Sequence, residues 1–512
     1  MSAPEPHPPQ VPPLEGGTRA LATFSLALAT LMNVLDTTIA NVSIPTIAGD
    51  IGVSASQGTW VITSFAVANA ISVPLAGWLA QRFGQVRVFV ASTLLFTFAS
   101  WLCGMAHSLE MLVAFRVLQG LVAGPMIPLS QSLLLQSYPT AKSGTALAIW
   151  GMTTTVAPVI GPILGGWISD NMTWGWIFYI NIPAGFLAAG MSWMLLRHRE
   201  LPTARLPVDT VGLALLILWV GALQLTLDRG KELDWFGSPV IVALAIVAVV
   251  GFCFFLIWER TEKHPIVDLS LFRERNFTVG TLAIALGYGV FFANILILPL
   301  WMQQYMGYTA TWAGLATAPI GILAILFMPM VGKNMGRIDP RRIVALGFLV
   351  FALASFMRAR FYTDITFWDV VWPQFIQGIA IAGFFVPLSA IIISGLSPAR
   401  IAAAAGLSNF ARISAGAVGA SIAVTLWEDR AALHHAQLVE SITPYHPAAQ
   451  ITLDALKQQG MSEQQALFFV NHAIDTQAAT LSAVEFFWVS GVIFLFLIGV
   501  MAFARKMGRK PA

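Results

Sequence analysis

The chain alternates between apolar runs of about 20 residues and short polar segments along nearly its whole length. A run of this length is what an α-helix needs to cross the hydrocarbon core of a bilayer. The strict alternation of apolar and polar residues that is typical of membrane β-barrels does not occur. The pattern therefore predicts an all-α polytopic membrane protein with 14 transmembrane helices, over residues 20–44, 57–80, 86–106, 110–135, 144–168, 176–196, 209–227, 239–258, 277–304, 312–331, 341–360, 370–394, 400–426 and 481–504.

Composition and charge agree with a membrane protein and give it an orientation. Hydrophobic residues make up 57% of the chain and charged residues 10%. Most of the 28 Lys and Arg residues lie in loops on the side of the N-terminal tail. The positive-inside rule therefore predicts that both termini are cytoplasmic. The Pro-rich residues 1–19 are expected to form a disordered cytoplasmic tail.

Two similar loops indicate an internal repeat. "GWLAQRFGQVRVF" follows the second predicted span and "GKNMGRIDPRRI" follows the tenth. Each joins two helices by a tight turn that contains Gly and Arg, as duplicated halves would. The prediction is two six-helix bundles plus two inserted central helices. The expected units are an N-terminal bundle over 20–200, the inserted helices with their linkers over 201–275, and a C-terminal bundle over 276–512.

One long polar segment, residues 427–480, lies on the non-cytoplasmic side of this topology. Pro444, Pro447 and Gly460 are expected to divide it into helices. Ser462 and Gln465 have the spacing of a capping box at the start of the last of them. The sequence leaves two interpretations open, a lid over the protein's own mouth or a docking surface for a partner.

Charged residues are scarce inside the predicted spans. Asp36, Arg116 and Arg412 are expected to be the only ones deep within the membrane, with Glu485 near the outer end of the last span. Burying an ionised side chain there costs about 2.5–3.5 kcal/mol, so each must pair, face water or, for Asp36, take up a proton. Arg116 keeps its charge and must be solvated or hydrogen-bonded.

These charges predict proton coupling. Asp36 is the main candidate for carrying the proton, with Arg116 setting its local field; the alternative is an Asp that only fixes helix packing. Arg412 attracts anionic substrates, neutralises Asp36, or simply braces its own helix. Glu485 caps the last span or acts as a second proton site. Asn33 lies three residues before Asp36 on one helix face, so both are expected to point into a central cavity.

Amide, aromatic and Met side chains inside the spans are candidates for lining that cavity, since such groups adapt to varied hydrophobic compounds. The alternative for each is packing or contact with lipid. The candidates are Met32, Asn33, Asn69, Gln131, Trp150, Asn294, Phe384 and Asn409.

The segment "APVIGPILGGW" has its own physical logic. Ala157, Gly161 and Gly165 recur every four residues and form a smooth helix face for close packing, while Pro158 and Pro162 bend the helix. Such a helix is either a pivot between moving halves or a tight contact without motion. The residues expected to shape the motion are those of this segment and of the loop after the second span: Gly77, Arg82, Gly84, Pro158, Gly161, Pro162, Gly165 and Gly166.

Other chemistries find no support in the sequence. The adjacent His434 and His435 have no Cys or paired carboxylate at metal-ligand spacing, so no metal site is predicted. No phosphate-binding GxxxxGK[ST] loop and no clustered catalytic set occur, so neither a cofactor nor an enzymatic activity is expected, and nothing points to nucleic acid.

Four motifs resemble those of the major facilitator superfamily, and the resemblance covers nearly the whole chain. "GWLAQRFGQVRVF" is similar to its loop after the second helix, with Gln81 where the pattern usually has Asp. "LVAFRVLQGLVAG", with Arg116, resembles the fourth-helix motif linked to proton coupling, and "APVIGPILGGW" the fifth-helix motif of antiporters. "LDTTIANVSIPTIA" resembles the first-helix motif of the 14-span drug:proton antiporters.

The resemblance implies the major facilitator fold and proton-driven efflux of hydrophobic drugs and weak-acid uncouplers across a bacterial inner membrane. It also implies partners besides protons and membrane lipids. A periplasmic adaptor (a membrane fusion protein) would dock on residues 427–480 and connect the pump to an outer-membrane channel. The alternative within the same fold is a porter for a metabolite or other solute.

Overall fold

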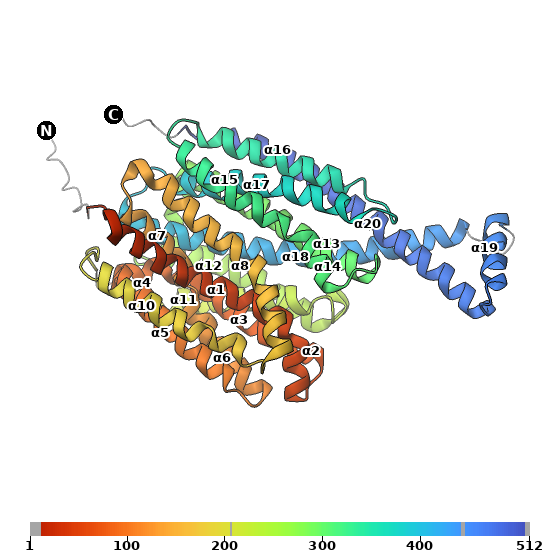
Figure 1. The fold of residues 1–512 in the computed structure, drawn as a ribbon. Coiled ribbons are helices and arrows are strands. Elements are labelled where there is room, and N and C mark those ends of the chain that lie inside the picture. Colours follow the sequence, from red (N-terminus) through yellow and green to blue (C-terminus); the bar gives the residue numbers. More distant parts are fainter. Residues whose placement is uncertain (1–11, 205–206, 442–445, 507–512) are drawn as a thin grey trace.

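The computed structural model describes residues 12–204, 207–441 and 446–506, and this part of the chain consists of helices and their connections (Figure 1). Thirteen helices of the described residues are long and apolar enough to cross a membrane. The 29-residue helix α8 (Ser143–Asn171) coincides with the remaining predicted span. The structure thus confirms the all-α polytopic fold class.

The first six spans pack together as the N-terminal half. Pro74 and Pro125 interrupt two of these spans, because proline lacks the N–H that continues an α-helix. Short helices lie in the connections of this half: α2 (Ala55–Gly58), η2 (Thr140–Lys142) and α9 (Trp176–Tyr179). The spans are α1 (Gly16–Ile51), α3 (Trp60–Ser72) continued by η1 (Val73–Leu75) and α4 (Ala76–Phe83), α5 (Gln85–Gly104), α6 (Leu109–Ala123) continued by α7 (Met126–Ser137), α8, and α10 (Asn181–Leu196).

The last six spans form the C-terminal half in the same order. The second of them is again broken at a proline, Pro319. The spans are α13 (Arg275–Gln304), α14 (Ala310–Thr317) continued by α15 (Pro319–Asn334), α16 (Pro340–Arg358), α17 (Phe367–Ile393), α18 (Pro398–Ser441) and α20 (Glu463–Met501), with η4 (Leu269–Arg273) ahead of α13 and α19 (Pro447–Gln458) between the last two.

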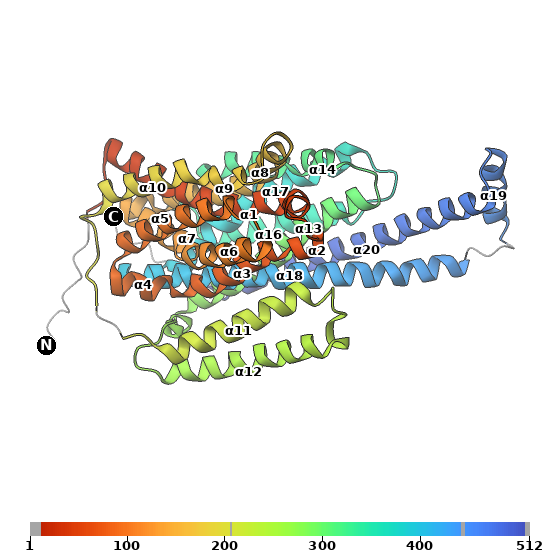
Figure 2. The ribbon, with the colours of Figure 1, turned by 90° about the horizontal axis from the view of Figure 1, so that it is seen from below.

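The inserted helices α11 (Thr210–Arg229) and α12 (Pro239–Thr261), with η3 (Trp235–Gly237) between them, lie at one edge of the bundle (Figure 2). They are central in the sequence but peripheral in space. Helix α11 contacts both halves: the Trp219 ring lies 5.7 Å from that of Phe410 in α18, and Thr63 in α3 donates a hydrogen bond to Asp228. The outward face of α12 exposes apolar side chains, as a lipid-facing surface would.

The described chain begins and ends on the same side of the bundle, which we call the termini side (Figure 1). The two halves approach closely there. A Cβ added to Gly144 in α8 would overlap the carbonyl oxygen of Gly332 in α15. A Cβ added to Gly77 in α4 would lie 2.5 Å from the Ala403 Cβ in α18. Only glycine permits these contacts, so the structure is closed between the halves on the termini side.

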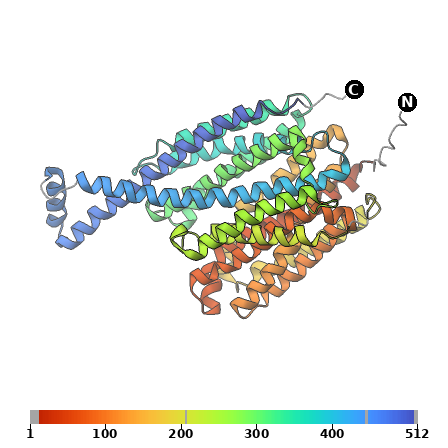
Figure 3. The ribbon, with the colours of Figure 1, turned by 180° about the vertical axis from the view of Figure 1, so that it is seen from behind.

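On the opposite side, the end of α18, the helix α19 and the start of α20 project far beyond the bundle (Figure 3). We call residues 431–478 the protrusion; its residues 442–445, with the predicted helix break at Pro444, lie outside the described residues. The lid interpretation is wrong, because the segment points away from the bundle. The predicted capping box is confirmed: Ser462 accepts a hydrogen bond from the Gln465 N–H, and Gln465 accepts one from the Ser462 N–H.

Candidate functional site

Asp36 lies at the centre of a buried polar cluster within the N-terminal half. Its Oδ2 accepts a hydrogen bond of 2.6 Å from Arg116 Nη1. Its Oδ1 accepts one of 3.0 Å from Gln119 and one of 2.8 Å from Asn181. Both amides also donate to the hydroxyl of Ser100. Four helices, α1, α5, α6 and α10, thus converge on one carboxylate whose oxygens are all satisfied in the ionised form.

The guanidinium of Arg116 is enclosed as tightly as its partner. Neither side chain of the Asp36–Arg116 ion pair is exposed. Arg116 Nε donates to the carbonyl oxygen of Val61, and the guanidinium lies 4.2 Å from the centre of the Phe65 ring. A pair removed from water in this way is sensitive to the loss of either charge.

The expectation that Asn33 and Asp36 point into a central cavity is wrong. Asn33 donates to the carbonyl oxygen of Ala123 in α6 and is buried, so both side chains turn into the N-terminal half. The reason is that α1 is packed on several sides by its own half, and its polar face meets α6 and α10 there.

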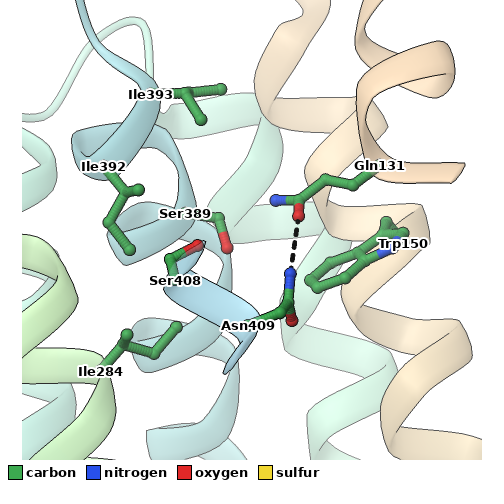
Figure 4. A pocket seen from close by; sticks show the side chains of 8 residues that line it. All are labelled: Gln131, Trp150, Ile284, Ser389, Ile392, Ile393, Ser408 and Asn409. Atoms are coloured by element: carbon green, nitrogen blue, oxygen red, sulfur yellow. Dashed lines mark hydrogen bonds between the residues drawn. The ribbon is translucent and has the colours of Figure 1, made fainter. Parts of the chain in front are cut away.

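A small pocket lies between the two halves (Figure 4). It brings together three of the predicted cavity residues. Asn409 in α18 donates a hydrogen bond of 3.4 Å across the halves to Gln131 in α7, and Trp150 in α8 covers one side. The remaining lining residues are Ile284, Ser389, Ile392, Ile393 and Ser408.

The other predicted cavity residues lie elsewhere. Phe384 is fully buried among the aromatic rings of the C-terminal half, and Met32 lies in the apolar core of the N-terminal half. Asn69 is partly buried in α3, and no hydrogen-bond partner for its Oδ1 is found among the described residues. Asn294 belongs to a second polar cluster, which surrounds Arg358.

The expectation that Asp36, Arg116 and Arg412 are the only deep charges is wrong, because Arg358 at the end of α16 is also fully buried. Arg358 Nη2 donates to Gln374 at 3.0 Å and to Gln377, and Nη1 donates to Asn294 at 3.4 Å. Asn294 in turn donates to Ser490 at 3.0 Å. No carboxylate pairs with this guanidinium in the parts of the chain that the structure describes.

This second cluster repeats the first in the other half. Asn294 in the first span of its half stands where Asp36 stands in the N-terminal half. Gln377 follows Gln119 by the same number of residues as Asn294 follows Asp36. Both glutamines lie in the fourth span of their half. The C-terminal half thus has an amide in place of the carboxylate, and its arginine, Arg358, lies on the third span instead of the fourth.

Arg412 lies close to the pocket and apart from Asp36. Its Nη2 donates to Asn409 at 3.0 Å, and its guanidinium lies 4.8 Å from the Tyr288 ring and 5.7 Å from that of Phe385. Glu485 accepts hydrogen bonds of 2.7 and 2.8 Å from Arg430 and so joins α20 to α18 at the base of the protrusion.

The predicted motion residues occupy two contacts. A Cβ on Gly161 would overlap the Thr38 hydroxyl, so α8 lies directly against α1 there. At the loop after the second span, Gly84 has φ +97° and faces Glu200, whose carboxylate accepts a hydrogen bond of 2.8 Å from the Arg87 N–H. Among the other predicted motion residues, Gly165 packs on Ile39 and Arg82 stacks on Trp78. A Cβ added to Gly166 would meet no atom within 4 Å, and Pro158 is exposed. The side chain of Pro162 lies outside the described residues.

Two helical halves around a shared pocket, with buried charge clusters inside each half, define a membrane transporter of the major facilitator type. The profile of the Major Facilitator Superfamily matches residues 26–420, and the chain belongs to this family. Within it, the chain is 54% identical over 497 residues to the Multidrug export protein EmrB of Escherichia coli (strain K12), covering 97% of both proteins. It is 52% identical over 494 residues to the Fatty acid resistance protein FarB of Neisseria gonorrhoeae, covering 96% of this chain and 97% of that one.

Solved structures share the fold at low sequence identity. The human organic anion transporter MFSD10 (TETRAN) superposes with a TM-score of 0.57 at 12% identity, over 95% of this chain and all of that one. A bacterial homologue of the human lysosomal transporter Spinster, in an inward-facing and unoccupied conformation, gives 0.53 at 17% identity, over 97% of this chain and 100% of that one.

Proposed function

We propose that the protein is a proton-driven multidrug exporter, a drug:H⁺ antiporter for hydrophobic drugs and weak-acid uncouplers. The observation that carries the proton coupling is the Asp36–Arg116 pair, a titratable carboxylate buried beside a permanent charge. The substrate class is supported by relatives named for multidrug export and for fatty acid resistance. We assign the protein no enzymatic role.

Transport then follows from alternating access between the halves. In the closed arrangement of the termini side, the two oxygens of Asp36 accept hydrogen bonds from three donors. Protonation removes the counter-charge of Arg116 and turns one Asp36 oxygen into a donor that faces another donor, so the cluster must rearrange when a proton enters. Because the cluster joins α1 to α6 and α10, this rearrangement changes the packing of the half that forms one wall of the pocket.

We further propose that the protein is the inner-membrane component of a tripartite system, with both termini cytoplasmic. The protrusion is the proposed dock for a periplasmic adaptor that leads to an outer-membrane channel. It presents large apolar side chains to solvent, with Phe468 74% and Ile451 69% exposed. Apolar groups exposed on a rod that projects away from the membrane are suited to a protein partner.

Purified protein in proteoliposomes tests export directly. A pH gradient, acidic on the protrusion side, should drive a fluorescent hydrophobic drug toward that side. Protons should move in the opposite direction and be released on the termini side. Drug movement that ignores the gradient would contradict antiport. In cells, expression with the adaptor should lower drug susceptibility more than expression alone.

A further inference from the structure

Three side chains form a layer one helical turn from the pocket, on the protrusion side. On α13, Tyr288 follows the pocket residue Ile284 by four positions. On α18, Arg412 follows Ser408 by four, and on α17, which runs in the opposite direction, Phe385 precedes Ser389 by four. Residues four apart lie above one another on a helix, so this layer continues the pocket outward. The ring contacts of Arg412 confirm that the three side chains meet.

The layer carries a positive charge without a counter-ion. Arg412 is 8% exposed, its Nε has no hydrogen-bond partner, and no carboxylate pairs with it within the described residues. Among the described residues, its one hydrogen bond to a side chain runs from Nη2 to the Asn409 oxygen. A guanidinium has five N–H donors, so most of its binding capacity is unused.

The second buried arginine without a carboxylate, Arg358, shows what a purely internal solution looks like. Three side-chain amides, those of Asn294, Gln374 and Gln377, direct their oxygens at its guanidinium, although its Nε, like that of Arg412, has no partner among the described residues. Arg412 has one amide, two aromatic faces and a pocket beside it. The contrast indicates that the charge of Arg412 is neutralised by something other than the protein.

We propose that Arg412, Tyr288 and Phe385 form a subsite for the anionic head group of a lipophilic weak acid, whose apolar body lies against Trp150 and Ile284. The guanidinium binds a carboxylate or phenolate by charge-assisted hydrogen bonds, and the rings exclude water from the contact. This inference rests on the proposed export function and assigns a residue to the selection of one substrate class.

A matched pair of ligands tests the subsite. Pyrenebutyrate and its methyl ester share one apolar body, and only the acid is charged at neutral pH. Their dissociation constants are measured by fluorescence on the purified full-length protein and its variants. The wild type should prefer the acid. Arg412→Gln should weaken acid binding about tenfold to a hundredfold, the value of a charged hydrogen bond, and leave ester binding nearly unchanged. Arg412→Lys should keep most of the preference.

Two further variants distinguish loss of the subsite from a folding defect. Asn409→Asp places a carboxylate beside Arg412 without a change in volume and neutralises it internally, so it should abolish the preference for the acid in a folded protein. Arg358→Gln removes the other unpaired buried charge and should leave the acid-to-ester ratio unchanged. An acid preference that survives both Arg412→Gln and Asn409→Asp overturns the subsite. If the wild type binds neither ligand, the proposed substrate class itself fails; if it binds both equally, only the subsite does.

Discussion

Replacing Asp36 by Asn should abolish proton-driven export and destabilise the N-terminal half. The amide has nearly the shape of the carboxylate but only one oxygen, whereas three donors point at Asp36. If the oxygen faces Gln119 and Asn181, the new NH₂ group meets Arg116 at the position of a 2.6 Å hydrogen bond. The opposite orientation places the new NH₂ group against the NH₂ groups of Gln119 and Asn181, which then keep only their hydrogen bonds to Ser100.

The larger part of the destabilisation is electrostatic. Arg116 cannot lose its proton and would remain fully buried without a counter-charge. Breaking a buried pair by removing one partner costs about 3–5 kcal/mol, while removing both charges is often close to neutral. The double variant Asp36→Asn/Arg116→Gln should therefore recover most of the stability that the single variant loses, yet transport no drug against a pH gradient.

Thermal unfolding of the purified variants measures the loss of stability, and gradient-driven drug movement in proteoliposomes measures the loss of coupling. Asp364→Asn, at an exposed connection, is the matched control and should change neither. A double variant that folds and pumps with the pH dependence of the wild type would refute the assignment of Asp36 as the coupling site, because that variant has no carboxylate in the cluster.

Three further changes test other contacts. His435 and Asp475 lie 2.7 Å apart, so a short turn replacing residues 436–474 should leave the bundle folded and drug binding intact while drug resistance in cells is lost; full resistance would argue against docking. Gly144→Val should prevent closure of the termini side, and cysteine labelling of that side should rise severalfold. Glu200→Ala removes the acceptor at the start of α5 and should lower stability by about 1 kcal/mol in thermal unfolding, without loss of drug binding.

The spans and the capping box could be predicted because their signals are local. An apolar run of sufficient length is a membrane helix whatever surrounds it. Ser462 and Gln465 satisfy each other's backbone N–H groups within one turn. The same reasoning does not reveal which face of a span meets which neighbour. Phe384 and Gln131 look alike as cavity candidates, but one is enclosed within its half and the other lies at the pocket.

Arg358 was beyond such reasoning for a different reason. It is the last residue of α16, and an arginine at the end of a span commonly extends its side chain to the membrane surface. What holds it inside are Gln374 and Gln377, which belong to the next span and lie across a connection. The burial of Arg358 results from the packing of α16 against α17, which the sequence does not reveal.

A comparison of the two polar clusters bears on where the proposed proton coupling acts. In the N-terminal half the buried positive charge is balanced by a carboxylate, Asp36, which can take up a proton. In the C-terminal half the corresponding residue is Asn294, and the charge of Arg358 is solvated by amides, which do not titrate in the physiological range. Protonation therefore changes the net charge of one cluster and not of the other. Under the proposed coupling at Asp36, the rearrangement begins among α1, α6 and α10, which the Asp36 hydrogen bonds join, while the cluster around Arg358 keeps its charge.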